Sequence, residues 1–220
     1  MENAKLAKLY FLGARSYVQA LTQLKYALSQ IALMHDNKDP YGIFIHRYKQ
    51  VEETDGKLEI FPFGTAAGEG RTRATLDIRL RDEPLKYRLV GVTGELVRVP
   101  EKAYFQEPYV QRSQTEVFTN VRGELDFWGI LEEAVQLTKV FHIAKYNSAN
   151  RQFRFVVGGF ENLPCKRIGE CENTEIGCRI LKHTENDIGI YNYVKIVLKD
   201  VDGEISFLLP FIGIPKGEAL

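Results

Sequence analysis

The sequence predicts an α+β fold in which a long N-terminal helix and a second helix pack on a mainly antiparallel sheet. Three observations predict it: a helical apolar repeat near the N-terminus, another near residue 130, and alternating segments separated by turn residues. The order of a helix followed by about four strands occurs twice. It indicates two α-β4 units, residues 1–100 and 101–220, or one continuous domain with both helices on one face of a single sheet.

The first predicted helix covers residues 5–34. Apolar side chains recur there at steps of four and three residues, namely Leu6, Tyr10, Ala14, Tyr17, Leu21, Leu24, Leu28 and Ile31. At about 1.5 Å per residue the helix would be roughly 45 Å long, so a large partner must cover it. We expect this stripe to form the spine of a core within one chain. An average step of about 3.5 residues also leaves open a homo-oligomer, such as a homodimer, that associates through residues 6–31.

Alternation and turn residues predict the strands. Residues 42–51 and 57–63 flank Asp55-Gly56, and residues 188–199 and 204–211 flank Asp202-Gly203, so each pair is expected to form a hairpin. Residues 71–81 alternate cleanly, which indicates a half-buried strand with a basic outer face. The second helix is expected from residue 127 to about residue 140, followed by a hairpin of residues 142–146 and 152–157.

Composition restricts the function classes. The chain has 220 residues, is 45% hydrophobic, and carries 29 basic and 29 acidic residues, so no overall field attracts it to nucleic acid or to an anionic membrane. No apolar stretch is long enough to span a membrane, and no export signal is evident at the N-terminus. Three cysteines indicate reduced thiols. We therefore expect a cytoplasmic protein without membrane association.

A basic strand face is the first candidate site. Glycines 64, 68 and 70 precede a strand whose arginines alternate, and these arginines are Arg71, Arg73, Arg79 and Arg81, joined by Arg88 on the next strand. Guanidinium groups and approachable backbone amides suit phosphate, so RNA or a nucleotide is the expected ligand. Tyr191 and Tyr193 share one strand face and would offer a stacking platform. The alternative is a solvated strand face whose charges resist edge pairing.

A cysteine and histidine cluster is the second candidate site. Cys165, Cys171, Cys178 and His183 supply three thiolates and one imidazole, a donor set that zinc accepts. No two of the cysteines have the short spacing of a zinc knuckle. Cys178 also alternates with Ile176 and Ile180, which fits a buried small apolar residue equally well.

These sites lead to three functional hypotheses. The first is a non-catalytic cytoplasmic binding module that contacts a phosphate-bearing partner, RNA or a nucleotide, through the basic strand face. The second is a small metal-dependent enzyme whose site combines the three cysteines with one histidine and whose cofactor is zinc. The third is an assembly subunit that self-associates through the N-terminal helix. The sequence identifies no catalytic residue, because none of the histidines lies beside an evident nucleophile.

Overall fold

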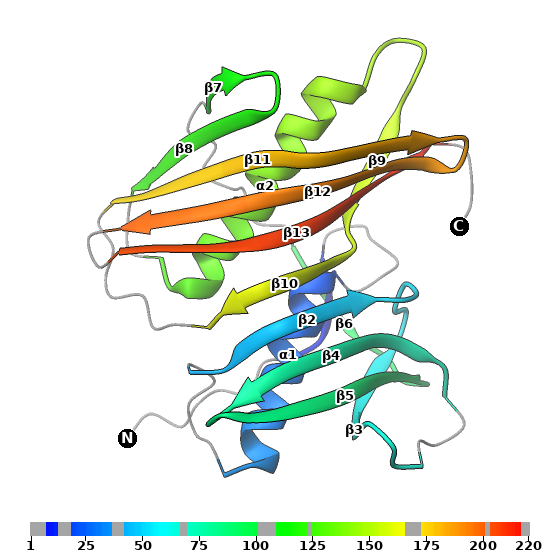
Figure 1. Ribbon diagram of the computed structural model, residues 1–220. Coiled ribbons are helices and arrows are strands. Elements are labelled where there is room, and N and C mark those ends of the chain that lie inside the picture. Colours follow the sequence, from blue (N-terminus) through cyan, green and yellow to red (C-terminus); the bar gives the residue numbers. More distant parts are fainter. Residues whose placement is uncertain are drawn as a thin grey trace. The chain divides into compact units, whose positions relative to one another are not determined.

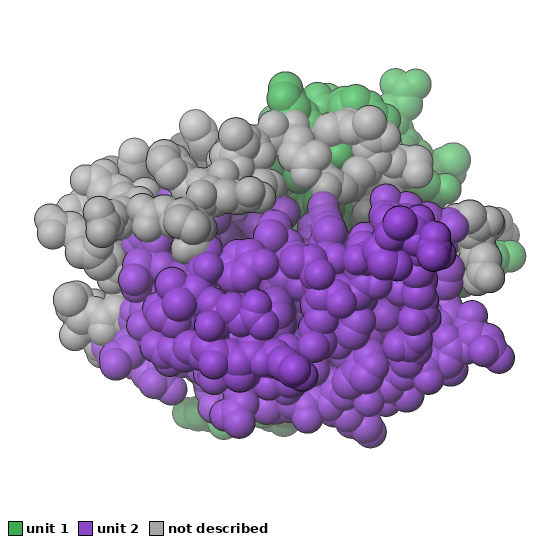
Figure 2. All heavy atoms as spheres, turned by 90° about the horizontal axis from the view of Figure 1, so that it is seen from above, with its two compact units in different colours: residues 1–103, 159–166 green, residues 104–158, 167–220 purple. Residues whose placement is uncertain are grey.

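The chain forms two compact units in a computed structural model, which describes residues 8–12, 19–36, 42–66, 70–100, 109–122, 125–165, 173–200 and 203–216. Unit 1 comprises residues 1–103 and 159–166, and unit 2 comprises residues 104–158 and 167–220 (Figure 2). Each unit contains a helix and antiparallel strands, which confirms the predicted α+β class. Within the described ranges, no helix has the length and apolar character that crossing a membrane requires.

Unit 1 packs one helix on an antiparallel sheet (Figure 1). Its strands hydrogen-bond in the order β3-β5-β4-β2-β10, and β1 pairs in parallel with β6 separately. The elements are α1 (Ala20–Met34), β1 (Tyr10–Leu12), β2 (Phe44–Gln50), β3 (Lys57–Pro62), β4 (Thr72–Leu80), β5 (Glu83–Val92), β6 (Val97–Val99) and β10 (Gly159–Pro164). β10 comes from the second half of the sequence but pairs with β2. The proposed domain limits of 1–100 and 101–220 stay a prediction.

The core of unit 1 lies between α1 and the sheet. Leu24 and Leu28 on α1 are fully buried, as are Leu76 on β4 and Leu89 on β5. Two tyrosine hydroxyls at this interface also find partners: that of Tyr26 donates to a β3 carbonyl oxygen at 3.3 Å, and that of Tyr48 on β2 donates to Gln23 Oε1 at 3.1 Å. The β4 alternation predicted from the sequence is confirmed, because Ala74, Leu76, Ile78 and Leu80 are all buried.

The N-terminal helix is shorter than predicted. It begins at Ala20, whereas Tyr10–Leu12 forms β1, and residues 1–7 and 13–18 lie outside the described part of the chain. Tyr10 and Leu12 fit a strand alternation as well as a helical repeat, and pairing with β6 decides between them. The described part of the apolar stripe on α1 is buried or half-buried inside unit 1. Self-association through residues 6–31 stays a prediction.

The hairpin predicted across Asp55-Gly56 is wrong. β2 pairs with β4 and β10, whereas β3 pairs with β5. The Asp-Gly signal reports only a local turn, and here longer-range pairing separates the two strands that flank it.

Unit 2 repeats the arrangement of a helix on an antiparallel sheet, with strands in the order β13-β12-β11-β8-β7 and β9 paired to β13 (Figure 1). Its elements are β7 (Val110–Ser113), β8 (Glu116–Arg122), α2 (Phe127–Tyr146), β9 (Phe153–Val157), β11 (Asn173–Asn186), β12 (Gly189–Asp200) and β13 (Gly203–Pro215). The β12–β13 hairpin predicted from Asp202-Gly203 is confirmed by the register, in which Asp200 opposes Gly203.

Helix α2 begins and ends for identifiable reasons. Asp126 caps its N-terminus, since its carboxylate accepts a hydrogen bond from the Gly129 backbone N–H at 2.8 Å. The helix continues to Tyr146, so the strand expected over residues 142–146 is wrong. Thr138, Phe141 and His142 are buried on the helix, which extends its apolar stripe beyond the predicted end.

A β-bulge interrupts β11 between Ile180 and Lys182. Ile180 opposes Val194 and Lys182 opposes Tyr193, so Leu181 is one extra residue on the bulged strand. Before the bulge, the side chains at 176, 178 and 180 face the interior and are buried. After it, His183 opposes the buried Asn192 and Glu185 opposes the buried Ile190. The bulge therefore moves the inward positions of β11 from even to odd numbers.

Candidate functional site

The predicted basic face is largely engaged by other parts of unit 1. Arg73 forms ion pairs with Glu52 at 2.8 Å and Asp55 at 3.4 Å. Arg88 donates to the Thr65 carbonyl oxygen at 2.6 Å. The Arg79 guanidinium lies 5.2 Å from the centre of the Phe44 ring. Arg71 and Arg81 are exposed at the two ends of the strand. The arginines thus do not form the free, continuous cationic surface that a phosphate backbone requires.

The predicted metal site is wrong. Across the described ranges, no group of three or more His, Cys, Asp and Glu side chains could hold a metal ion. Cys165 is buried in unit 1 and Cys178 is buried on β11 in unit 2, while Cys171 lies outside the described residues. The Thr138 hydroxyl of α2 donates to Cys178 Sγ at 3.6 Å. Cys178 is therefore a small core residue, as the alternative interpretation of the sequence proposed.

The buried thiols should be unreactive. Burial raises the pKa of Cys165 and of Cys178 to about 12, so very little reactive thiolate exists at pH 8. In a Cys171→Ser variant, we expect Ellman's reagent to detect almost no thiol in the native protein and both thiols after unfolding in guanidinium. Rapid stoichiometric reaction of the native variant would contradict the burial of these side chains.

The two predicted platform residues lie on the outer face of unit 2. Tyr191 and Tyr193 are 39% and 38% exposed, and they flank the buried Asn192 on β12. Their cross-strand neighbours on β11 are Thr184 and Lys182. They share a strand face, as the sequence indicates, but this face is opposite to the one that carries the polar cluster described next.

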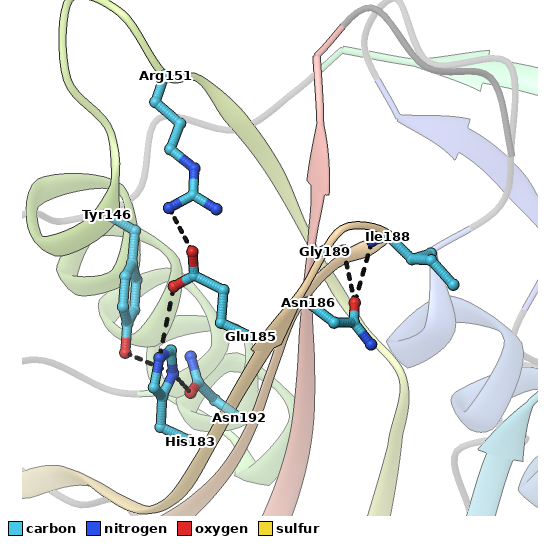
Figure 3. A network of polar contacts seen from close by, with 8 residues as sticks. All are labelled: Tyr146, Arg151, His183, Glu185, Asn186, Ile188, Gly189 and Asn192. Atoms are coloured by element: carbon cyan, nitrogen blue, oxygen red, sulfur yellow. Dashed lines mark hydrogen bonds and ion pairs between the residues drawn. The ribbon is translucent and has the colours of Figure 1, made fainter.

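A polar cluster lies on the inner face of unit 2 at the C-terminal end of α2 (Figure 3). We call it the His183 cluster, and it consists of Tyr146, Arg151, His183, Glu185 and Asn192. His183 Nδ1 lies 2.8 Å from Asn192 Oδ1 and 3.3 Å from the Tyr146 hydroxyl. The Tyr146 and His183 rings are stacked, with centroids 5.3 Å apart. These contacts fix the orientation of the imidazole.

The other side of the His183 ring faces a charged pair. His183 Nε2 lies 3.6 Å from Glu185 Oε2, and Glu185 forms an ion pair with Arg151. Burial is the main cause that raises the pKa of Tyr146, and the Glu185 charge adds to it, whereas the side chain of Asn192 acts in the opposite direction. The His183 side chain is 40% exposed. The cluster therefore presents an oriented imidazole, next to a carboxylate and a tyrosine hydroxyl, to the solvent.

His142 lies beneath the cluster, one helical turn before Tyr146. It is fully buried among Phe141, Phe155 and Phe211, with ring centroids 4.8 Å from Phe211. Its Nδ1 lies 2.7 Å from the Thr138 carbonyl oxygen. Burial lowers the pKa of His142 to about 4, so this imidazole is neutral at physiological pH.

The sequence predicts His183 as a site residue, but as a zinc ligand together with the cysteines. In the structure its neighbours are Asn192 and Tyr146. The alternation of Ile176, Cys178 and Ile180, continued without interruption, directs His183 to the outer face. The bulge at Leu181 reverses that direction and brings His183 to Asn192 and Tyr146. An extra residue of this kind depends on pairing with β12, so no local pattern in the sequence indicates it.

The chain is similar in fold to solved structures, but it matches no known family. No family model matches the chain, and no curated protein matches it. Among solved structures, a GphF dehydratase variant matches with a TM-score of 0.50 and 11% identity, over 96% of this chain and 89% of that one. A conserved protein from Alicyclobacillus acidocaldarius matches with a TM-score of 0.43 and 12% identity, over 93% and 89%. The acyl-CoA thioesterase II TesB2 from Mycobacterium marinum matches with a TM-score of 0.46 and 9% identity, over 91% of each chain.

The Alicyclobacillus acidocaldarius protein has a hot dog fold. At such low identity the likeness shows the fold alone, which here is a helix against an antiparallel sheet in each unit.

The prediction of a non-catalytic module for RNA or a nucleotide is therefore wrong. The structural neighbour that matches at a TM-score of 0.50 is a dehydratase. The arginines on which that prediction depended also make ion pairs, a hydrogen bond and a cation–π contact within unit 1. The metal-dependent alternative is wrong for the described residues as well.

Proposed function

We propose that this chain is an enzyme that acts on acyl thioesters. The observation that supports the proposal is the likeness to a dehydratase structure along 96% of the chain, at a TM-score of 0.50. The His183 cluster adds an oriented imidazole, the kind of side chain that most often transfers protons in enzymes. The cytoplasmic location expected from the sequence is part of the proposal.

Acid and base catalysis without a covalent acyl-enzyme is the chemistry that suits this cluster. A thioester carbonyl acidifies the hydrogen on the neighbouring carbon. A base that removes this proton, with an acid that protonates a β-hydroxyl group, releases water and leaves a double bond. We assign the base to His183, through Nε2, because Nδ1 is held by Asn192. The two described thiols are buried and protonated, so they are poor nucleophiles.

The experiment is a comparison of two reactions on one protein preparation. Purified full-length protein is incubated with 3-hydroxybutyryl-CoA, and formation of the conjugated enoyl thioester is followed by ultraviolet absorbance. A parallel incubation with butyryl-CoA measures release of free thiol. Formation of the enoyl thioester would support dehydration by acid and base catalysis. Release of free thiol would support an acyl-thioester enzyme that hydrolyses its substrate, as a thioesterase does. Absence of both reactions with CoA and carrier-protein thioesters of short, medium and long chains would refute the proposal.

A further inference from the structure

A row of cross-strand neighbours runs beneath the end of α2. In the sheet of unit 2, His183 on β11 opposes Asn192 on β12, which in turn opposes Phe211 on β13. Helix α2 places two rings over this row: His142 contacts Phe211, and Tyr146 stacks on His183. Because His142 and Tyr146 are four residues apart on a helix, they lie on the same face. The row is therefore covered by aromatic rings but contains several polar atoms.

Two of these polar atoms are buried without a partner. His142 Nε2 and Asn192 Nδ2 have no hydrogen-bond partner among the described residues. His142 is 0% exposed and Asn192 is 2% exposed. A buried polar atom that lacks a hydrogen bond destabilises the fold, so two in one row require an explanation.

The chemistry of the two atoms is complementary. The Thr138 carbonyl oxygen can only accept, so His142 Nδ1 carries the proton, and Nε2 of the neutral ring is an acceptor. Asn192 Oδ1 faces His183 Nδ1 at 2.8 Å, which leaves Asn192 Nδ2 as a donor. A partner for both must be able to accept one hydrogen bond and donate another. A carboxylate only accepts and an ammonium only donates, whereas a hydroxyl group does both.

We propose that the row binds an O–H group, which accepts a hydrogen bond from Asn192 Nδ2 and donates one to His142 Nε2. Two sources have this chemistry: a water molecule, and the β-hydroxyl group of a 3-hydroxyacyl thioester. The second source rests on the proposed function, and the first does not. Tyr146 borders the site, because its ring centroid is 5.7 Å from that of His142 and its hydroxyl lies 3.3 Å from His183 Nδ1, which in turn lies 2.8 Å from Asn192 Oδ1. The bound O–H group would lie beside the oriented imidazole of His183.

The first test uses the protein without any ligand. In protein labelled with 15N-histidine, the Nε2 resonance of neutral His142 should lie upfield of its position in an Asn192→Leu variant, because the bound O–H group donates to it. A cross-peak between water and His142 would identify water as the source. The matched control is Gln23→Leu, which removes a buried side chain of unit 1 that the Tyr48 hydroxyl already contacts, and it should leave the His142 resonance unchanged.

The second test distinguishes the two sources. We expect 3-hydroxybutyryl-CoA to bind about 10-fold more tightly than butyryl-CoA if the substrate hydroxyl is the ligand, a difference typical of one good hydrogen bond. Both Asn192→Leu and His142→Phe should abolish this preference, and His142→Phe keeps an aromatic ring among Phe155 and Phe211. If water is the ligand, the two thioesters bind equally and the upfield shift is present in the free protein. An unshifted Nε2 resonance, both without and with 3-hydroxybutyryl-CoA, would refute the site whether or not the enzyme turns over thioesters.

Discussion

Replacing His183 by Gln should lower acyl-thioester turnover by about 100-fold or more, since positioned general bases typically contribute about 10²–10⁴-fold to the rate. Glutamine keeps a polar side chain of similar reach but cannot accept and release a proton at neutral pH. The His183 side chain is 40% exposed, so the fold should tolerate the change. Steady-state kinetics with the thioester that the wild-type protein converts would measure the effect, and thermal melting would verify that the variant is folded.

Tyr191→Ala provides the matched control for His183→Gln. Tyr191 lies on the neighbouring strand, is similarly exposed, and points to the opposite face of the sheet. Its removal should change turnover by no more than about 2-fold, within the small effects expected of a surface substitution. Equal losses in the two variants would indicate that the reaction takes place elsewhere, and an unaffected His183→Gln variant would remove His183 from the mechanism.

Replacing Leu28 by Ala should destabilise the protein by about 2–5 kcal/mol, the usual cost of truncating a fully buried leucine. Leu28 is 0% exposed in the middle of α1, and the variant leaves a cavity against the sheet of unit 1. Urea unfolding followed by circular dichroism would measure the free energy of unfolding.

Leu33→Ala is the control on the same helix. Leu33 is 54% exposed, so its truncation should change the free energy of unfolding by less than about 0.5 kcal/mol. The concentration dependence of the two midpoints adds a test of self-association. If Leu28 served an interface between copies, its loss would act most strongly in dilute solution, and midpoints that are independent of protein concentration place it in the core of one chain.

The sequence predicted the elements whose stabilising contacts are close in sequence. β4 alternates as expected, α2 begins where its apolar repeat begins, and β12 and β13 pair with Asp200 opposite Gly203. Two of the errors have one common cause, which is pairing between distant segments. Such pairing turns Tyr10–Leu12 into a strand beside β6 and separates β2 from β3.

The candidate site was only partly accessible to sequence reasoning. The sequence predicts His183 as a zinc ligand together with Cys178. In the structure, Cys178 lies in the core and accepts a hydrogen bond from Thr138. Asn192 and Tyr146 carry no motif, and their role depends on the register of β11 against β12. His142 was assigned to a strand, so its position beneath Tyr146 could not be inferred.

The extra residue in β11 also limits how this strand can be redesigned or can diverge. Removing Leu181 alone would leave Ile180 opposite Val194 and Lys182 opposite Tyr193, so the side chains from position 182 to the turn at Asn186 would keep their present faces. Removing Lys182 as well would place His183 directly after Ile180 and rotate this end of the strand by half a revolution. His183 and Glu185 would then turn to the solvent, and Thr184 would enter the interior. The orientation of the cluster therefore survives the loss of one residue at the bulge but not the loss of two.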